Sequence, residues 1–231
     1  ALHQTVKEIT GFQYLLPTHQ GRAAENVLFS LLVKEGDVVP GNSHFDTTKG
    51  HIEIRKAHAI DCTVDEAFDI ENLFPFKGNI DLEKLEDVYK TYPKEKIPFC
   101  LITITCNSSG GQPVSLENMK AVKELSDRYG IPIYFDSARF AENAYFIKKR
   151  ELGQEHRTIK EICKEVFSYG VGMTMSSKKD GLVNIGGFIA LNDENIFRAA
   201  SNMTIIYEGF ITYGGMAGRD MAALAVGLNE A

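Results

Sequence analysis

The stretch Phe99–Thr105 is the feature of this sequence that most constrains its fold. It is apolar and rich in β-branched residues, which is typical of a central strand in a parallel sheet covered by helices on both faces. Helical spacing follows at Leu116–Tyr129, and a second apolar run then ends at Asp136. Strands that alternate with helices predict an α/β fold, with a mainly parallel sheet flanked by helices.

The same reasoning predicts further elements along the chain. Helices are expected near Gly21–Lys34, Asp81–Tyr92, Phe140–Arg150, Ile159–Tyr169 and Met216–Leu228. Short strands are expected at Ser43–Phe45, Ala57–Cys62, Val171–Met175 and Gly186–Leu191. With 231 residues, of which 44% are hydrophobic, the chain can bury a full core, and we expect one large domain over residues 1–231.

Composition excludes several classes of function. A net charge of −6 argues against a nucleic-acid-binding protein, because phosphate contacts need a basic face. No apolar stretch is long enough to span a membrane. The H-E-x-x-H motif of catalytic zinc sites is absent from the sequence. The four cysteines show no C-x-x-C spacing, which predicts reduced core thiols in a cytoplasmic protein.

Two predicted strand ends carry groups that could work together. Lys178 and Lys179 lie in the polar loop between the strands Val171–Met175 and Gly186–Leu191, and Asp136 ends another strand. A lysine pair is ordinarily solvated surface charge. A strand-end lysine with a strand-end aspartate is, however, what pyridoxal 5′-phosphate (PLP) needs. The amine forms a Schiff base, and the carboxylate keeps the pyridine nitrogen protonated so that the ring accepts electrons.

A phosphate site is predicted where the first helix begins. Gln20-Gly21-Arg22 combines free backbone N–H groups, a glycine that allows close approach and an arginine fork. The alternative is an ordinary helix cap followed by a surface arginine, since no glycine-rich phosphate-binding motif is present. Ser176 is placed to add a hydroxyl to the same phosphate, or it is a solvated loop serine.

Two other loops offer contacts to a ligand. Phe45 could stack on a planar cofactor or belong to the core, and Asp46 could accept a substrate hydrogen bond or cap a helix. Asn107 follows the Phe99–Thr105 strand in a glycine-rich loop, where it could reach a ligand at the carboxyl edge of the sheet. For the loop Tyr207–Gly215, which is rich in glycine and aromatic residues, we expect packing in the core or at a subunit contact.

Four segments together resemble the β-eliminating lyases, whose fold is the aspartate-aminotransferase-like fold type I of PLP enzymes. The segments are Pro17–Asn26, Asn107–Ser115, Asp136–Ile147 and Met175–Asp180. The resemblance covers nearly the whole chain, and the long Asp136–Ile147 motif is highly specific. It implies a PLP-dependent carbon–carbon lyase whose substrate is a small molecule, an amino acid.

The resemblance also implies roles for individual residues. Lys179 matches the Schiff-base lysine, Asp136 the partner of the pyridine nitrogen, and Phe45 the ring-stacking aromatic residue. The residues that match the phosphate cradle are Gln20, Gly21, Arg22 and Ser176. The groups around the phenolic oxygen of the cofactor match Asn107 and Arg139, and Asn184 matches a residue whose carbonyl helps to bind an activating potassium ion.

The family contains indole-lyases that cleave tryptophan and phenol-lyases that cleave tyrosine. Phe45–His51 is similar to the indole-lyases, because phenol-lyases usually have threonine where Asp46 stands. A carboxylate can accept the indole N–H, whereas phenol needs another partner. Leu182–Gly187 and Gly215–Asp220 look closer to the phenol-lyases. Weighing Asp46 more heavily, we expect cleavage of L-tryptophan to indole, pyruvate and ammonia, with tyrosine as the alternative.

The resemblance further implies a fragment. We expect residues 1–231 to be the PLP-binding large domain, without an N-terminal arm and a C-terminal small domain, and to have little lyase activity alone. Family members are tetramers, so a homodimer or a homotetramer is expected. The remaining alternatives are a non-catalytic PLP-binding fragment and an unrelated nucleotide-binding domain that uses the start of the Gly21 helix.

Overall fold

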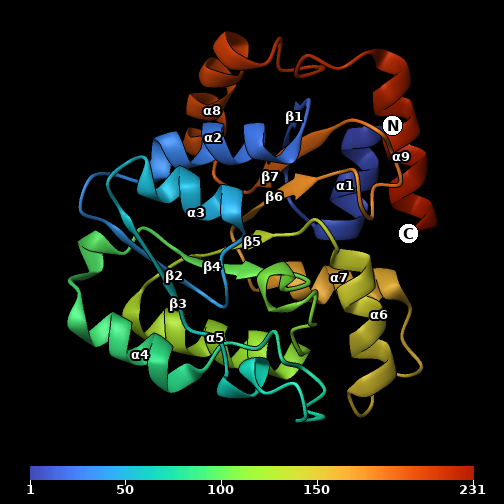
Figure 1. Cartoon of the computed structure of the whole chain (residues 1–231). Coiled ribbons are helices and arrows are strands. Elements are labelled where there is room, and N and C mark those ends of the chain that lie inside the picture. The colour runs from blue at the N-terminus through green and yellow to red at the C-terminus, as the bar shows by residue number, and fades with distance from the viewer.

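One seven-stranded sheet runs through the molecule (Figure 1), and the computed structural model describes all residues from 1 to 231. The strands are β1 (Tyr14–Thr18), β2 (Val38–Gly41), β3 (His58–Asp61), β4 (Cys100–Thr103), β5 (Ile133–Asp136), β6 (Gly172–Ser176) and β7 (Gly187–Leu191). They lie in the order β1-β7-β6-β5-β4-β2-β3. Four of the six pairings are parallel, and only β7, which pairs with β6 and with β1, is antiparallel to its neighbours.

Helices cover both faces of this sheet, so the chain forms three layers (Figure 1). One face carries α2 (Gly21–Leu32), α3 (Asp46–Glu53) and α8 (Glu194–Tyr207). The other carries α1 (Leu2–Thr10), α4 (Leu82–Thr91), α5 (Leu116–Tyr129), α6 (Phe140–Arg150), α7 (Ile159–Ser168) and α9 (Gly218–Glu230). Short 3₁₀ turns lie at Asp65–Phe68, Lys94–Lys96 and Asn107–Ser109.

Alternation along the central strands divides the core into two clusters. Leu101 and Tyr134 pack against α2 and α3, whereas their neighbours Ile102 and Phe135 pack against the helices of the opposite face. The side chains of a strand point alternately to the two faces of its sheet, so a strand buried on both sides must be apolar throughout. This geometry explains the unbroken apolar runs in the sequence.

The predicted α/β class with a mainly parallel sheet is confirmed, as are most predicted elements. The strand predicted at Ser43–Phe45 is wrong: the strand is Val38–Gly41, and α3 begins at Asp46. The chain leaves the sheet at Asn42 because the side chain of Asn42 bonds to backbone groups of β4 in place of a strand ladder. Helices α1, α3 and α8 and strand β1 were not predicted.

Two predictions from composition can also be compared with the structure. All four cysteines are buried free thiols, as predicted. Among the helices, none combines the length and the apolar character needed to cross a membrane.

Asn42 yields a test of the fold. Its buried side-chain amide donates to Gly78 O and Thr103 O, each at 2.9 Å, and its oxygen accepts from Thr103 N at 2.9 Å. Asn42→Ala leaves these buried groups without partners and should lower the free energy of unfolding by about 2–4 kcal/mol. Urea unfolding measures the change. Asn195→Ala, an exposed control, should change stability by less than about 0.5 kcal/mol, and equal effects of the two substitutions would contradict the expectation.

Candidate active site

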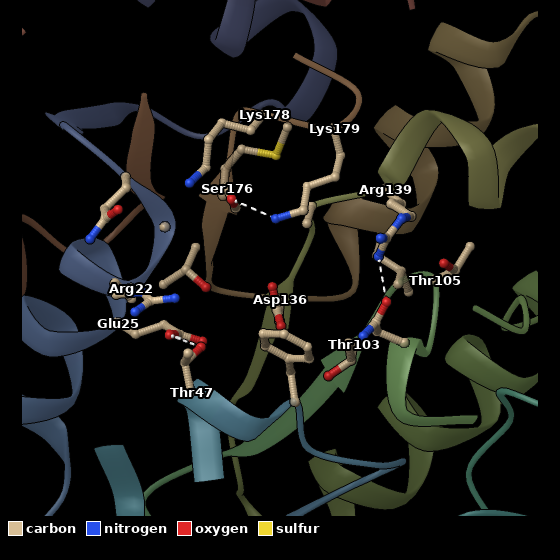
Figure 2. Close-up of a pocket in the computed structure, with 18 residues that line it drawn as sticks. Arg22, Glu25, Thr47, Thr103, Thr105, Asp136, Arg139, Ser176, Lys178 and Lys179 are labelled. Carbon is tan, nitrogen blue, oxygen red and sulfur yellow. Dashed lines mark hydrogen bonds between the residues drawn. The ribbon is translucent and has the colours of Figure 1, made fainter. Parts of the chain in front are cut away.

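A cavity opens at the carboxyl ends of the central strands. Its empty volume, including the open part at the mouth, is about 720 Å³. Strand register builds its floor, because Thr103 of β4 pairs with Asp136 of β5, which pairs with Thr174 of β6. Tyr134 packs on the α2 face, so Asp136, two residues further along the strand, points to the same face. Figure 2 shows Asp136 at the centre of the residues that line this cavity.

The first turn of α2 forms one wall of the cavity. Asp81, Ser115, Thr158 and Asp193 cap the helices α4, α5, α7 and α8 with their side chains, but no side chain caps α2 at Gln20. A Cβ on Gly21 would lie 2.6 Å from the Cβ of Ser176, so only glycine lets this turn approach the end of β6. The uncapped helix start, with Arg22 and Ser176 beside it, suits an anion.

The lysine loop follows β6 and delivers an amine to the cavity. Nζ of Lys179 donates a hydrogen bond to Oγ of Ser176 at 2.8 Å, and Lys178 also lines the cavity but is more exposed (Figure 2). Burial, with the nearby charges of Arg139 and Lys178, lowers the pKa of Lys179 from its ordinary value. A lowered pKa leaves more of the amine neutral, which is the nucleophilic form.

Asp180 fixes this loop against the helix that follows β5. Its Oδ2 accepts hydrogen bonds from the backbone N–H groups of Ala141 at 2.7 Å and Glu142 at 3.0 Å, in the first turn of α6. This helix has no capping side chain of its own, so Asp180 satisfies N–H groups that would otherwise lack an acceptor. The loop and the Asp136–Arg139 segment are thereby held together.

Asp136 is held in an environment that opposes its ionisation. Burial, and then the negative charge of Glu25, raise the pKa of Asp136 to about 7, although Lys179 and Arg139 favour the charged form. A carboxyl group of this kind gains most when a cation comes next to it. The environment of Asp136 therefore favours an ion pair between its carboxylate and a positively charged ring nitrogen.

Other lining residues complete the wall opposite α2. Nη1 of Arg139, which Figure 2 labels, donates a hydrogen bond to Oδ1 of Asn107 at 2.9 Å, and this bond links two side chains of the cavity lining. Phe45, the residue that precedes α3, lines the cavity from the other side. The hydroxyl groups of Thr103 and Thr105 are buried without hydrogen-bond partners, so the cavity wall has unused polar groups.

The composition of the cavity fits PLP. Its ionisable lining consists of four cations (Arg22, Arg139, Lys178 and Lys179) and two carboxylates (Glu25 and Asp136), an excess of two positive charges when all are ionised. A phosphate carries up to two negative charges, and the uncapped start of α2 adds a place for it. An amine, a carboxyl group and an aromatic side chain stand around the same space.

The structure brings nine of the eleven predicted site residues to one cavity: Gln20, Gly21, Arg22, Phe45, Asn107, Asp136, Arg139, Ser176 and Lys179. Asp46 is not among the lining residues and is exposed in the first turn of α3. Asn184 is exposed in the loop between β6 and β7, also outside the lining. Tyr213 is exposed as well, in the loop between α8 and α9.

Three cavity features escaped the sequence analysis. Glu25 lines the cavity, Asp180 fixes the lysine loop, and the hydroxyl groups of Thr103 and Thr105 reach the cavity wall. Glu25 could have been noticed, because it shares a helical face with the apolar Leu28 and Leu32, and a carboxylate on an apolar face is expected to be buried with partners. Nothing in the spacing indicates the partner of Asp180.

No group of three or more histidine, cysteine, aspartate or glutamate side chains is placed to hold a metal ion. The potassium prediction rests on Asn184 alone, and one backbone carbonyl does not make an ion site. Potassium therefore stays a prediction, and no chemical step is derived through it.

Comparison with known proteins gives a consistent result. The family profile described as "Beta-eliminating lyase" matches residues 1–229. A Trichomonas vaginalis protein named "Probable beta-eliminating lyase" is 65% identical over 99% of this chain and 50% of its own length. A tyrosine phenol-lyase of Lacrimispora saccharolytica is 53% identical over 99% of this chain and 49% of its own length. The chain thus spans about half the length of the curated relatives it matches.

Solved structures share the fold at low sequence identity. Serine palmitoyltransferase of Sphingomonas wittichii gives a TM-score of 0.66 at 16% identity, over 99% of this chain and 49% of that chain. A methionine γ-lyase of Micromonospora echinospora gives 0.65 at 16% identity, over 98% and 51%. At this identity the likeness concerns the fold alone, which is that of fold-type-I PLP enzymes.

The pKa of Asp136 predicts a pH dependence of stability. Because its pKa in the folded chain lies near 7, above the ordinary value near 4, the folded state favours the neutral carboxyl group. This contribution is present below about pH 4 and is lost as the pH rises toward 7. The unfolding free energy of the wild type should therefore fall relative to that of Asp136→Asn across this window in urea titrations. A constant difference would contradict the assignment.

Proposed function

The chain belongs to the family of PLP-dependent β-eliminating lyases, and on this premise we propose that its cavity binds PLP and serves carbon–carbon β-elimination from an aromatic L-amino acid. One observation carries the proposal. The amine of Lys179, with a lowered pKa, shares a cavity with the Asp136 carboxyl group and the uncapped start of α2. These are the three groups that a phosphorylated pyridine aldehyde requires.

Each part of the cofactor has a partner in this proposal. The start of α2 at Gln20–Arg22 and the hydroxyl group of Ser176 hold the phosphate, and Lys179 holds the aldehyde carbon. Asp136 stabilises a proton on the ring nitrogen, and Phe45 covers one face of the ring. Asn107 and Arg139, which are hydrogen-bonded to each other, would bind the phenolic oxygen. When bound, PLP supplies an electron sink for the α-carbon of an attached amino acid.

The residues of the chain then do the proton work and the positioning. Lys179, once free, takes the α-proton at Nζ, and its lowered pKa keeps a share of the amine neutral for this task. Ser176 holds that amine in place before the reaction, through the 2.8 Å hydrogen bond. Asp136, ionised once a cation lies beside it, would stabilise the proton on the ring nitrogen.

We propose L-tryptophan as the substrate on the motif around Asp46, because a carboxylate at this position can accept the indole N–H. Asp46 is exposed and follows the lining residue Phe45 in the sequence, but it is not itself part of the lining. The products are indole, pyruvate and ammonia. L-Tyrosine is the second candidate, supported by relatives at 48–53% identity that are named tyrosine phenol-lyase. A potassium ion at Asn184 and a homodimer or homotetramer accompany the proposal on the family resemblance alone. A cytoplasmic location accompanies it too, on the cysteine pattern and the resemblance.

The two neighbouring lysines offer a matched test of cofactor attachment. After incubation with PLP and reduction with borohydride, peptide mass spectrometry should find one stoichiometric adduct, on Lys179. Lys178→Ala should keep this adduct, because Lys178 is the more exposed of the two, and Lys179→Ala should lose it. An adduct on Lys178 in the wild-type chain, or an unchanged yield in Lys179→Ala, would contradict the proposed site.

The substrate is tested in an enzyme that joins this chain to the remaining half of the T. vaginalis relative. We expect kcat/KM for indole release from tryptophan to exceed that for phenol release from tyrosine. Asp46→Thr should lower the indole value about ten- to hundredfold, the worth of one hydrogen bond to a charged group. Equal PLP occupancy of both proteins serves as the control. Phenol release without indole release would favour the tyrosine candidate.

A further inference from the structure

Glu25 is a buried carboxylate of the cavity that the proposed mechanism does not use. It lies on α2, is only 5% exposed, and lines the same space as Asp136 and Lys179 (Figure 2). Two hydroxyl groups of the first turn of α3 donate hydrogen bonds to it: Thr47 to Oε2 at 2.7 Å, and Thr48 to Oε1. The carboxylate is thereby fixed in position and cannot turn out to solvent.

The charges around Glu25 come from every element that meets there. Arg22 lies on its own helix, Lys179 in the loop after β6, and Asp136 at the end of β5, where Arg139 also acts on Asp136. Burial raises the pKa of Glu25 in spite of the two threonine hydroxyl groups and of both cations. Glu25 in turn opposes the ionisation of Asp136.

Two carboxylates in one low-dielectric cavity cannot both ionise without cost. When two such groups interact strongly, their protons leave in two separate steps that belong to the pair. A cation that arrives beside one of them favours loss of the retained proton. The cavity therefore contains two carboxyl groups that can share one proton, Asp136 at the end of β5 and Glu25 on α2.

We propose that Glu25 is a positioning residue that acts through Asp136: held by Thr47 and Thr48, it makes the two carboxylates retain one proton near neutral pH until a cation reaches Asp136. This inference rests on the proposed function only for the identity of that cation, which is the protonated ring nitrogen of PLP. Asp136 then becomes fully ionised when the cofactor is present, whereas without the cofactor the two carboxylates together hold one proton and one negative charge.

The experiment follows the ionisation of Asp136 in the 231-residue chain without PLP. Carboxyl bands are recorded by infrared spectroscopy across pH, and the band lost in Asp136→Asn assigns the group. Glu25→Gln keeps the shape but removes the charge, and should lower the midpoint of Asp136 by at least about one pH unit. Thr48→Val should move the midpoint in the same direction by less, because Glu25 without this donor is more often neutral.

Controls separate electrostatic coupling from a merely structural role. Glu53→Gln, an exposed change at the end of α3, should leave the midpoint of Asp136 where it is in the wild type. Hydrogen exchange of α3 reports whether Glu25→Gln loosens the helix. An unchanged Asp136 midpoint in Glu25→Gln, with or without looser exchange in α3, would overturn the proposal.

The titration also distinguishes this inference from the proposed function. It needs no cofactor, so a wild-type chain that fails to attach PLP at Lys179 would count against the proposed function alone. A shifted Asp136 midpoint in Glu25→Gln would support the carboxylate pair in either case.

Discussion

The in-register parallel pairing of β4, β5 and β6 is the constraint on which the rest of the site depends. It aligns Thr103, Asp136 and Thr174 in one row, and the alternation of strand side chains turns that row toward α2. A slip of one residue in β5 would turn Asp136 toward the opposite layer, into an apolar cluster where a carboxyl group has no partner. The apolar residues Ile133–Phe135, which precede Asp136, thus fix the register and the orientation of the site together.

Loops and helix starts then bring charge to this row. The α2 start lies open at the cavity because no side chain caps it and because Gly21 lets it approach Ser176. The lysine loop is held by Asp180, which supplies the missing cap of α6. Four cations and two carboxylates meet in one space, where burial first, and then the neighbouring like charges, lower the pKa of Lys179 and raise that of Asp136. The reactivity of each group is therefore a property of the whole cavity.

Much of the fold could be predicted because its elements carry strong local signals. Helices α5 and α6 were predicted with their observed bounds, since apolar periodicity marks both and Gly130 ends α5 in a left-handed conformation. The Ser43–Phe45 strand was wrong because the side-chain bonds of Asn42, which take the chain out of the sheet, are made to residues 36 and 61 positions away. Such contacts leave no periodicity in the sequence.

By itself, the sequence determined the α/β class, the strand ends that carry Asp136 and the lysine pair, and the family, because these depend on local pattern and on motifs. Only the tertiary structure decided that Lys179 is the more buried of the two lysines and that Asp46 stands outside the lining of the cavity. It alone placed Glu25 near Asp136, more than a hundred positions away in the sequence. Burial and the distance between charges set the pKa values in the site, and both arise only when separate segments pack together.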